Sequence, residues 1–233
     1  VSFIQFFNFS CIFITYNYTI YLIFFYFSGE YKADWIFERR PMPDKKTIRI
    51  NFISSAYAQE SKIVIGKKYI SLEETLPSYL ERFKELASYK SVVMEHKTWN
   101  LLGQNKFLPY SQNIIITKKP GGVMANISER DLNHTHRIAI ADSFEEALML
   151  AWSKEVLVIG EAEIYATALP VANFIHHTMI DEKFEGGSFF PDCNWDKDWE
   201  KIHSENFNPG EKKTQKDKFR SWYLVFERKH KIP

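Results

Sequence analysis

Two pairs of histidines are the side chains of this sequence that could hold a metal ion. They are His134 with His136, and the adjacent His176 and His177. A protein zinc site is tetrahedral and draws on cysteine, histidine and carboxylate ligands at short, regular spacings. No cysteine or carboxylate completes a tetrahedral set beside either pair at a familiar spacing, so we interpret neither as a metal site. We expect His176 and His177 to alternate across a strand instead.

Composition and charge exclude two further classes, nucleic-acid-binding proteins and disulfide-rich proteins. The chain has 233 residues, and its 30 Lys and Arg against 29 Asp and Glu give a formal net charge of +1. A near-neutral chain gives no electrostatic reason to expect a nucleic-acid groove, so we predict no nucleic-acid partner. The two cysteines, Cys11 and Cys193, stand too far apart to build a disulfide framework.

The N-terminal run 1–28 is uncharged, rich in aromatic residues and long enough to cross a bilayer as a helix. A membrane anchor is one interpretation, although polar residues interrupt the run and no basic residue precedes it. The alternative is a translated AT-rich stretch upstream of the gene, because Glu-Arg-Arg-Pro directly before Met42 can encode a purine-rich ribosome-binding sequence. We expect translation to start at Met42. The chain then divides into an extension over 1–41 and a domain over 42–233, with a membrane partner only if 1–28 is real.

From Met42 onward, short apolar strands alternate with amphipathic helices. The β-rich stretch 47–58 precedes a helix over 76–86, in which Leu76, Leu80 and Phe83 recur on one face. Strands of this apolar kind, alternating with helices, are typical of a parallel sheet covered on both faces. Further strands are predicted at 91–94, 113–117, 137–141 and 156–159.

The C-terminal part follows a different pattern. The stretches 199–207 and 219–228 read as an antiparallel hairpin, and the polar run 210–218 between them reads as an exposed loop. The sequence therefore predicts a three-layer α/β domain, with a mostly parallel central sheet and a C-terminal antiparallel hairpin at its edge.

Two local signals mark where elements begin and end. Ser143, with Glu146 three residues later, makes a capping box for a helix that runs to about Trp152. The stretch 118–122 (KKPGG) reads as the turn that ends the strand before it.

Four motifs carry a more specific signal than periodicity does. In their chain order and spacing they resemble the dihydrofolate reductase family, whose pattern has a Met-Gly-basic-basic-Thr-Trp turn, a Leu-Pro before a strand, an Ile-Gly-Gly leading to Tyr, and Glu-Gly-Asp-x-x-Phe-Pro. The resemblance covers about residues 50–228. The motifs are VVMEHKTW (92–99), LPYSQNIIIT (108–117), LVIGEAEIYATALPVA (157–172) and TMIDEKFEGGSFFPD (178–192).

The resemblance implies that NADPH lies across the carboxyl ends of the central strands. Thr98 would contact the cofactor phosphates, while Lys118 and Lys119 would hold the adenosine 2′-phosphate, unless those lysines only form a solvated turn. Gly160, which lacks a side chain, would let the nicotinamide approach the backbone, and Tyr165 would lie over its ring. The cofactor-binding residues implied in this way are His96, Lys97, Thr98, Thr117, Lys118, Lys119, Gly160, Glu161, Ala162 and Tyr165.

The resemblance also implies a pterin or folate substrate between the first helix and the nicotinamide. Phe83 would line this pocket, although a Phe on an apolar helix face is as often simply part of the core. Thr178 would support the catalytic acid of the pocket. The substrate-binding residues implied are Ala56, Phe83, Leu102, Leu108, Ser111 and Ile159.

Tyr79 stands where the family has the buried Asp or Glu that serves the protonation step. Glu81 is a poor substitute because it points about 200° away on the same helix, so Glu73 or Glu74 would have to reach in from the preceding loop. Proton delivery is therefore the part of a reductase mechanism that this sequence supports least.

Other cleft positions also depart from the family pattern. Ser111 replaces the Arg that pairs with the glutamate carboxylate of folate, and a hydroxyl supplies neither its charge nor its fork. Glu95 replaces a Gly before the phosphate-binding turn, and Glu161 with Ala162 replaces a Gly-Gly pair. Glu163 stands where a basic residue often holds the 2′-phosphate. Carboxylates at these positions oppose a bound phosphate.

Three functions follow from this combination. The first is NADPH-dependent reduction of 7,8-dihydrofolate to tetrahydrofolate, by a protein that we expect to be cytoplasmic and monomeric. The second is reduction of another heterocycle, such as a ribityl-aminopyrimidine, which has no glutamate tail. The third is a binding protein that has kept the fold and lost the chemistry.

Overall fold

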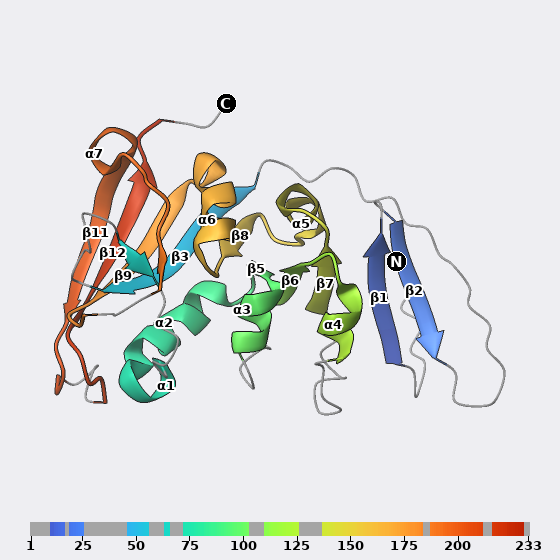
Figure 1. The fold of residues 1–233 in the computed structure, drawn as a ribbon, viewed down its shortest axis with the longest axis horizontal. Helices are drawn as coiled ribbons and strands as arrows, with labels where there is room; N and C mark the ends of the chain where they lie inside the picture. The colour runs from blue at the N-terminus through green and yellow to red at the C-terminus, as the bar shows by residue number, and fades with distance from the viewer. Residues whose placement is uncertain are drawn as a thin grey trace.

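The computed structural model describes nine stretches of the chain, which are 10–16, 19–25, 46–55, 63–65, 72–102, 110–125, 137–183, 187–211 and 216–230. Most of them belong to one sheet with helices on both faces (Figure 1). The histidine pair at 134 and 136 lies outside these stretches.

The central sheet has the strand order β11-β12-β9-β3-β8-β5-β6-β7. The pairs β9-β3, β3-β8, β8-β5, β5-β6 and β6-β7 are parallel, whereas β11-β12 and β12-β9 are antiparallel. Two short strands, β4 (Val64–Ile65) and β10 (Ser188–Phe189), pair with each other, and β4 also pairs with β3. The predicted α/β class and the C-terminal antiparallel hairpin are therefore confirmed. The remaining strands are β3 (Thr47–Ser55), β5 (Ser91–Glu95), β6 (Gln112–Ile116), β7 (Ile138–Ala141), β8 (Glu155–Val158), β9 (Phe174–Ile180), β11 (Trp199–Phe207) and β12 (Ser221–Arg228).

Helices cover the sheet on two sides and make it the middle of three layers. In Figure 1, α5 and α6 lie on one side and α2, α3 and α4 on the other. A short 3-10 helix, Leu169–Val171, follows α6. The helices are α1 (Leu72–Thr75), α2 (Pro77–Ala87), α3 (His96–Leu101), α4 (Pro120–Ala125), α5 (Phe144–Leu150), α6 (Ala162–Ala168) and α7 (Trp195–Asp198).

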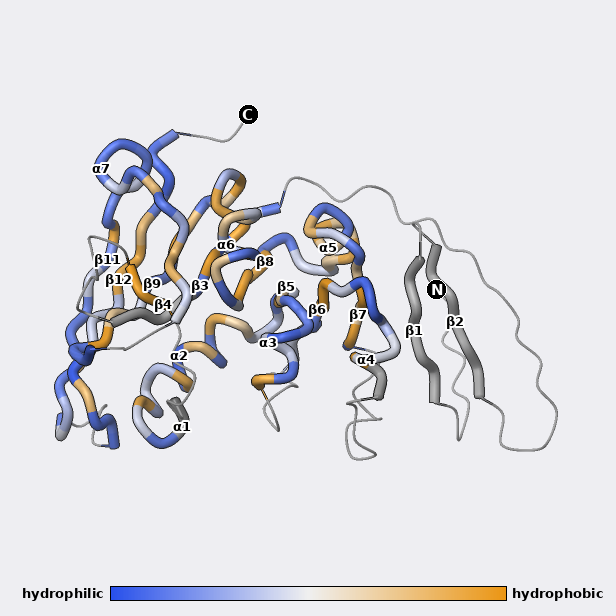
Figure 2. The backbone as a smooth tube through the Cα atoms, viewed as in Figure 1, coloured by the Kyte–Doolittle hydropathy of each residue, from blue (hydrophilic) through white to orange (hydrophobic). Residues whose placement is uncertain are grey.

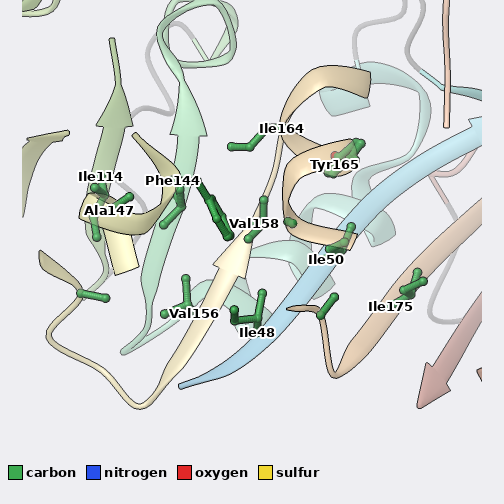
Figure 3. Packing of buried hydrophobic residues seen from close by; sticks show 14 of the residues in the cluster. Ile48, Ile50, Ile114, Phe144, Ala147, Val156, Val158, Ile164, Tyr165 and Ile175 are labelled. Atoms are coloured by element: carbon green, nitrogen blue, oxygen red, sulfur yellow. The ribbon is translucent and has the colours of Figure 1, made fainter. Parts of the chain in front are cut away.

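The central strands are apolar on both faces because each face has its own core. Within β5, Val93 packs in the cluster beneath α5 and α6, while Val92 and Met94 pack in the cluster beneath α2 and α3. This alternation follows from the two-residue period of a strand. Figure 3 shows the first cluster around Val156, Val158 and Phe144, and Figure 2 shows the apolar colour concentrated in these strands.

The predicted start of the helix after Ser143 is confirmed. The Ser143 hydroxyl accepts a hydrogen bond from the Glu146 amide at 3.1 Å, as a capping residue should. The predicted turn over 118–122 is wrong in part, because α4 begins at Pro120. Proline lacks an amide proton and fixes φ near the helical value, so it starts a helix as readily as it ends a strand.

The predicted exposed loop over 210–218 is wrong at Asp217, which is buried. Its carboxylate accepts a hydrogen bond from the Ser78 amide at 3.1 Å and another, very short one from the Ser78 hydroxyl. These bonds satisfy donors in the first turn of α2, which needs acceptors because its own amides have no intrahelical partner there. A residue from the C-terminal hairpin therefore fixes the start of this helix.

Part of the apolar N-terminal run is described, and it forms strands. β1 (Ser10–Tyr16) and β2 (Thr19–Phe25) pair antiparallel in a sheet of their own. Across the stretches that the structure describes, no helix is both long and apolar enough to span a membrane.

Candidate active site

The carboxyl ends of β5, β6 and β8 meet at one edge of the sheet because these strands are parallel. Gly160 lies two residues after the end of β8 and directly before Glu161, the N-cap of α6, with a φ of +148° that L-residues with side chains rarely adopt. A Cβ on Gly160 would lie 2.9 Å from Ile164 Cγ2 and 3.1 Å from Thr98 Oγ1. Only glycine therefore fits this backbone path between β8 and α6.

Two polar side-chain atoms at this edge are buried without a hydrogen-bond partner among the described residues. They are Thr98 Oγ1 and His96 Nε2, both on α3. His96 packs against Gly122 of α4, where a Cβ would lie 2.9 Å from its Cε1. Buried polar groups are rarely left unpaired, so these atoms mark a place where a polar ligand group would satisfy the protein. We call His96, Thr98, Gly160 and Glu161 the Gly160 edge.

The Gly160 edge also carries negative charge. Burial raises the pKa of Glu95 above its usual value, and repulsion from Glu163 and Glu161 raises it further. Lys97 Nζ lies 2.5 Å from Glu161 Oε2, and this ion pair is exposed to solvent. Its hydrogen bond to Glu161 raises the pKa of Lys97. One cation among three carboxylates leaves the edge less favourable to a polyanion than its glycine and hydroxyl alone would be.

Tyr165 on α6 holds the backbone at Gly160 in place. Its hydroxyl accepts a hydrogen bond from the Gly160 amide at 2.9 Å and donates one to the Asn51 carbonyl, also at 2.9 Å. The ring packs against Phe190, with centroids 5.6 Å apart. Burial raises the pKa of Tyr165 well above its usual range, so the phenol stays protonated. Tyr165 therefore links β3, β8 and α6 at the point where Gly160 turns.

Tyr79 lies on α2, on the other side of the sheet from α6. Its side chain is 8% exposed, and its ring stacks on Phe83 with centroids 6.3 Å apart. Burial raises the pKa of Tyr79 to about 12, although the neighbouring Arg82 and Asn51 side chains partly offset the rise. A phenol with so high a pKa is a weaker acid than a carboxyl group by many orders of magnitude.

Arg82 lies one helical turn after Tyr79, and it is not among the residues predicted from the sequence. Its guanidinium donates a hydrogen bond to Thr178 Oγ1 at 3.1 Å. The same group lies 4.4 Å from the Tyr223 ring centroid and 4.7 Å from that of Phe207. Residues three apart share a helix face, so the spacing of Arg82 from Tyr79 was the available signal. We call Tyr79, Arg82, Thr178 and Tyr223 the Tyr79 cluster.

His176 connects the Tyr79 cluster to Arg49. Its Nε2 lies 3.3 Å from a guanidinium nitrogen of Arg49, and its Nδ1 lies 2.7 Å from the Tyr223 hydroxyl. Arg can only donate, so Nε2 accepts and the proton of the neutral ring is on Nδ1, which donates to Tyr223. Burial and then repulsion from Arg49 lower the pKa of His176 to about 4, which keeps the ring neutral at neutral pH.

Comparison with known proteins places this chain in a family. The family model described as dihydrofolate reductase matches residues 52–224. The chain belongs to the dihydrofolate reductase family.

Related reductases match most of their own length. The dihydrofolate reductase of Bacillus subtilis is 27% identical over 76% of this chain and 95% of that protein. That of Haemophilus influenzae is 28% identical over 71% of this chain and 92% of that protein. A solved dihydrofolate reductase from Enterococcus faecalis, complexed with NADP(H) and RAB-propyl, has a TM-score of 0.60 at 22% identity, covering 79% of this chain and 97% of that one, which shows the fold.

As a dihydrofolate reductase family member, the chain brings many of the predicted residues to the two ends of its site. His96, Thr98 and Gly160 gather at the Gly160 edge, with the exposed Lys97 bonded to Glu161 there. The Thr117 hydroxyl accepts a hydrogen bond from the Lys119 amide at 3.0 Å, and both Lys118 and Lys119 are exposed. Ala162 starts α6 and is partly buried in the core beneath that helix.

On the substrate side, the structure places several predicted residues in the core. Phe83 and Ile159 are buried in the cluster beneath α2 and α3, and Leu102 packs against it. The Ser111 hydroxyl is fully buried and donates a hydrogen bond to the Ala87 carbonyl at 2.8 Å. The other two predicted substrate contacts, Ala56 and Leu108, lie outside the described residues.

The two histidines of the β9 strand take separate roles. His177 stacks on Trp195, with centroids 6.4 Å apart, whereas His176 bonds to Tyr223. Burial lowers the pKa of His177 to about 3, so this ring is neutral as well. Neither histidine belongs to a group of metal-binding side chains within the part of the chain that the structure describes.

Proposed function

We propose that this protein catalyses the NADPH-dependent reduction of 7,8-dihydrofolate to tetrahydrofolate, and that turnover is slow. The observation that carries the proposal is the Gly160 edge of a dihydrofolate reductase family member. Gly160 follows a backbone path that no residue with a side chain fits, and the buried Thr98 hydroxyl beside it has no hydrogen-bond partner among the described residues.

The residues of this edge fit the cofactor in kind. Thr98 and His96 would bond the phosphates, and Lys118 and Lys119 would bind the adenosine 2′-phosphate, because exposed ammonium groups suit a phosphate dianion. Tyr165 would keep Gly160 in the conformation that admits the nicotinamide. Bound NADPH supplies a hydride, and the protein supplies position and charge around it. Glu161 and Glu95 would weaken cofactor binding without preventing it.

The substrate side supports slow turnover. The pterin would lie against α2 and β9, where Thr178 and Tyr79 stand in the Tyr79 cluster. The nitrogen beside the reduced carbon needs a proton, and a positioned acid of suitable pKa accelerates such a step by about 10²–10⁴. Tyr79, whose pKa is about 12, holds its proton too firmly to supply that acceleration. Protonation from solvent is then the slow step.

A second candidate is reduction of a heterocycle without a glutamate tail, such as a ribityl-aminopyrimidine. The observation that favours it is Ser111, whose hydroxyl is bonded to the Ala87 carbonyl and carries no charge for a substrate carboxylate. For either substrate, we propose a cytoplasmic monomer whose catalytic domain spans 42–233.

The test follows NADPH absorbance in the full chain, with and without dihydrofolate. We expect oxidation that depends on dihydrofolate and that rises at least about tenfold in Tyr79→Asp, because a carboxyl group at position 79 can serve as the acid for the protonation step. Tyr79→Phe, which removes only the hydroxyl, serves as the control and should stay slow. NADPH oxidation that is absent from both the wild type and Tyr79→Asp would overturn the proposal.

A further inference from the structure

Arg82 is a partly buried cation in contact with two aromatic rings. The guanidinium carbon lies over the Tyr223 and Phe207 rings, and the side chain reaches from α2 to Thr178 on β9. Burial lowers the pKa of Arg82, which shows that the charged form has lost solvation. Cation–π contact with an aromatic face offsets only part of the lost solvation free energy, by about 0.5–2 kcal/mol for each ring in contact.

Within the described residues the guanidinium of Arg82 makes one side-chain hydrogen bond, and none of its nitrogens is both fully buried and without a partner. It has five N–H donors, and one of its nitrogens donates to Thr178. Ion pairs among the described residues join other groups and include Arg49 and Lys90 to Glu155, Lys97 to Glu161, and His203 to Glu205.

Glu205 and Asp217 are the carboxylates whose negative charges act on Arg82, and neither forms an ion pair with Arg82. Both oxygens of Asp217 accept hydrogen bonds from Ser78, and Glu205 lies 3.7 Å from His203. A desolvated cation without an adjacent carboxylate is unfavourable unless another acceptor reaches it. The remaining donors of Arg82 are therefore available to a ligand.

We propose that Arg82 is a specificity-determining residue, which selects heterocycles that present a carbonyl or anionic oxygen towards α2 over heterocycles that present amino groups there. The inference rests on the proposed function, because it places the heterocycle beside Tyr79 and Thr178. Amino groups are donors, and they meet a guanidinium that has no acceptor to offer.

The proposal predicts an order of affinity for three closely matched ring systems. Pteridine-2,4-dione carries oxygen acceptors at both positions, 2,4-diaminopteridine carries amino donors at both, and pterin carries one of each. The pterin ring of dihydrofolate can turn its oxo group towards Arg82 and remains a substrate. A diaminopteridine has no such orientation, and its protonated form is also repelled by the cation.

The experiment measures the dissociation constants of these three compounds with the full chain by calorimetry, in the absence of NADPH. We expect the dione to bind at least about tenfold more tightly than the diamino compound, with pterin between them, since charge-assisted hydrogen bonds are the stronger ones. Arg82→Gln should reduce the ratio to below about threefold, and Arg82→Lys, which keeps the charge, should retain a preference for the dione. Lys84→Gln removes the same charge from the same helix and should leave the ratio unchanged.

Two outcomes would overturn the proposal. One is a wild type that binds the diamino compound as tightly as the dione or more tightly, and the other is a ratio that Arg82→Gln leaves intact. Failure of all three rings to bind would overturn this proposal and the proposed function together. A preference for the dione in a protein that never oxidises NADPH with dihydrofolate would overturn the proposed function alone.

Discussion

The Gly160 edge and the Tyr79 cluster lie at two ends of one candidate site and differ in what maintains them. At the Gly160 edge the essential features are a backbone angle, a missing side chain and a hydroxyl, with Tyr165 bonded to the Gly160 amide. In the Tyr79 cluster the essential features are side chains, and here the Tyr79 phenol lies near the Arg82 guanidinium, which bonds to Thr178.

The difference shows how a family site can diverge without losing its fold. A backbone path that only glycine can follow cannot be changed without disturbing β8 and α6, which are part of the core. A side chain at the surface of a helix can be exchanged when its neighbours accept the new charge. Tyr79 and Arg82 share one face of α2, so a change at one alters the surroundings of the other.

The largest effect expected is on the Gly160 side. Gly160→Ala places a methyl group 2.9 Å from Ile164 Cγ2 at a φ of +148°, and should destabilise the fold by about 3 kcal/mol. Urea unfolding measures the change. Gly121→Ala is the matched control, because nothing lies within 4 Å of its Cβ, and it should change stability by less than about 1 kcal/mol. Equal losses of stability in the two variants would contradict the claim that only glycine fits the backbone at position 160.

The next effect concerns the histidines beside the Tyr79 cluster. His176 and His177 have pKa values lowered from 6.5 to about 4 and about 3, so the unfolded chain binds more protons than the folded one below pH 6.5. Stability should therefore be complete well above pH 6.5 and fall by about 2 kcal/mol for each ring, about 4 kcal/mol for the two, on acidification to about pH 5. Urea midpoints across this range measure the fall. His177→Phe should reduce the slope of the urea midpoint against pH, whereas His203→Gln, at a half-exposed position, should not. A slope that neither substitution changes would contradict the claim that the rings of His176 and His177 are buried and neutral.

The smallest effect concerns charge at the Gly160 edge. Glu161→Gln removes a carboxylate bonded to Lys97 and should tighten NADPH binding about threefold at low salt, because the phosphates then meet less repulsion. The gain should shrink as salt is added. Glu200→Gln removes an exposed carboxylate on β11 and serves as the control. Weaker NADPH binding in Glu161→Gln would mean that the Lys97 ion pair organises the edge instead of obstructing it.

Glu95 at the same edge gives a related pH dependence. Its pKa is raised above 4.5 in the folded protein, so its contribution to stability is present below that pH and is lost as pH rises through the raised value. Its protonation also removes one negative charge near the phosphates. NADPH affinity should therefore increase as pH falls towards the raised pKa, and Glu95→Gln should flatten the dependence in a fluorescence titration.

Much of the fold could be predicted because its signals are local. The apolar runs of β5 and β8, the helical spacing in α2 and the cap at Ser143 each depend on residues close in the sequence. The family motifs also assigned Thr98 and Gly160 to one cofactor, Thr98 to its phosphates and Gly160 to its nicotinamide. A single sequence shows these features because each depends on residues that are close together in the chain.

The rest depended on contacts between distant residues. Asp217 reaches Ser78 across 139 positions, and Arg82 reaches Thr178 across 96, so no local pattern marks either contact. The charged run around Asp217 looked solvated because composition cannot show that a single carboxylate turns inward. Arg82 belongs to none of the family motifs, and Glu81 beside it is exposed, so the sequence around Arg82 reads as a solvated helix face.

The central claim is that the Gly160 edge still accepts NADPH while the Tyr79 cluster has changed independently of it. A calorimetric titration of the full chain with NADPH, repeated on Tyr79→Asp and Arg82→Gln, tests this most directly. We predict saturable binding of one NADPH per chain, with affinities that agree within about twofold among the three proteins. Absence of NADPH binding in the wild type, or its loss in either variant, would contradict the claim.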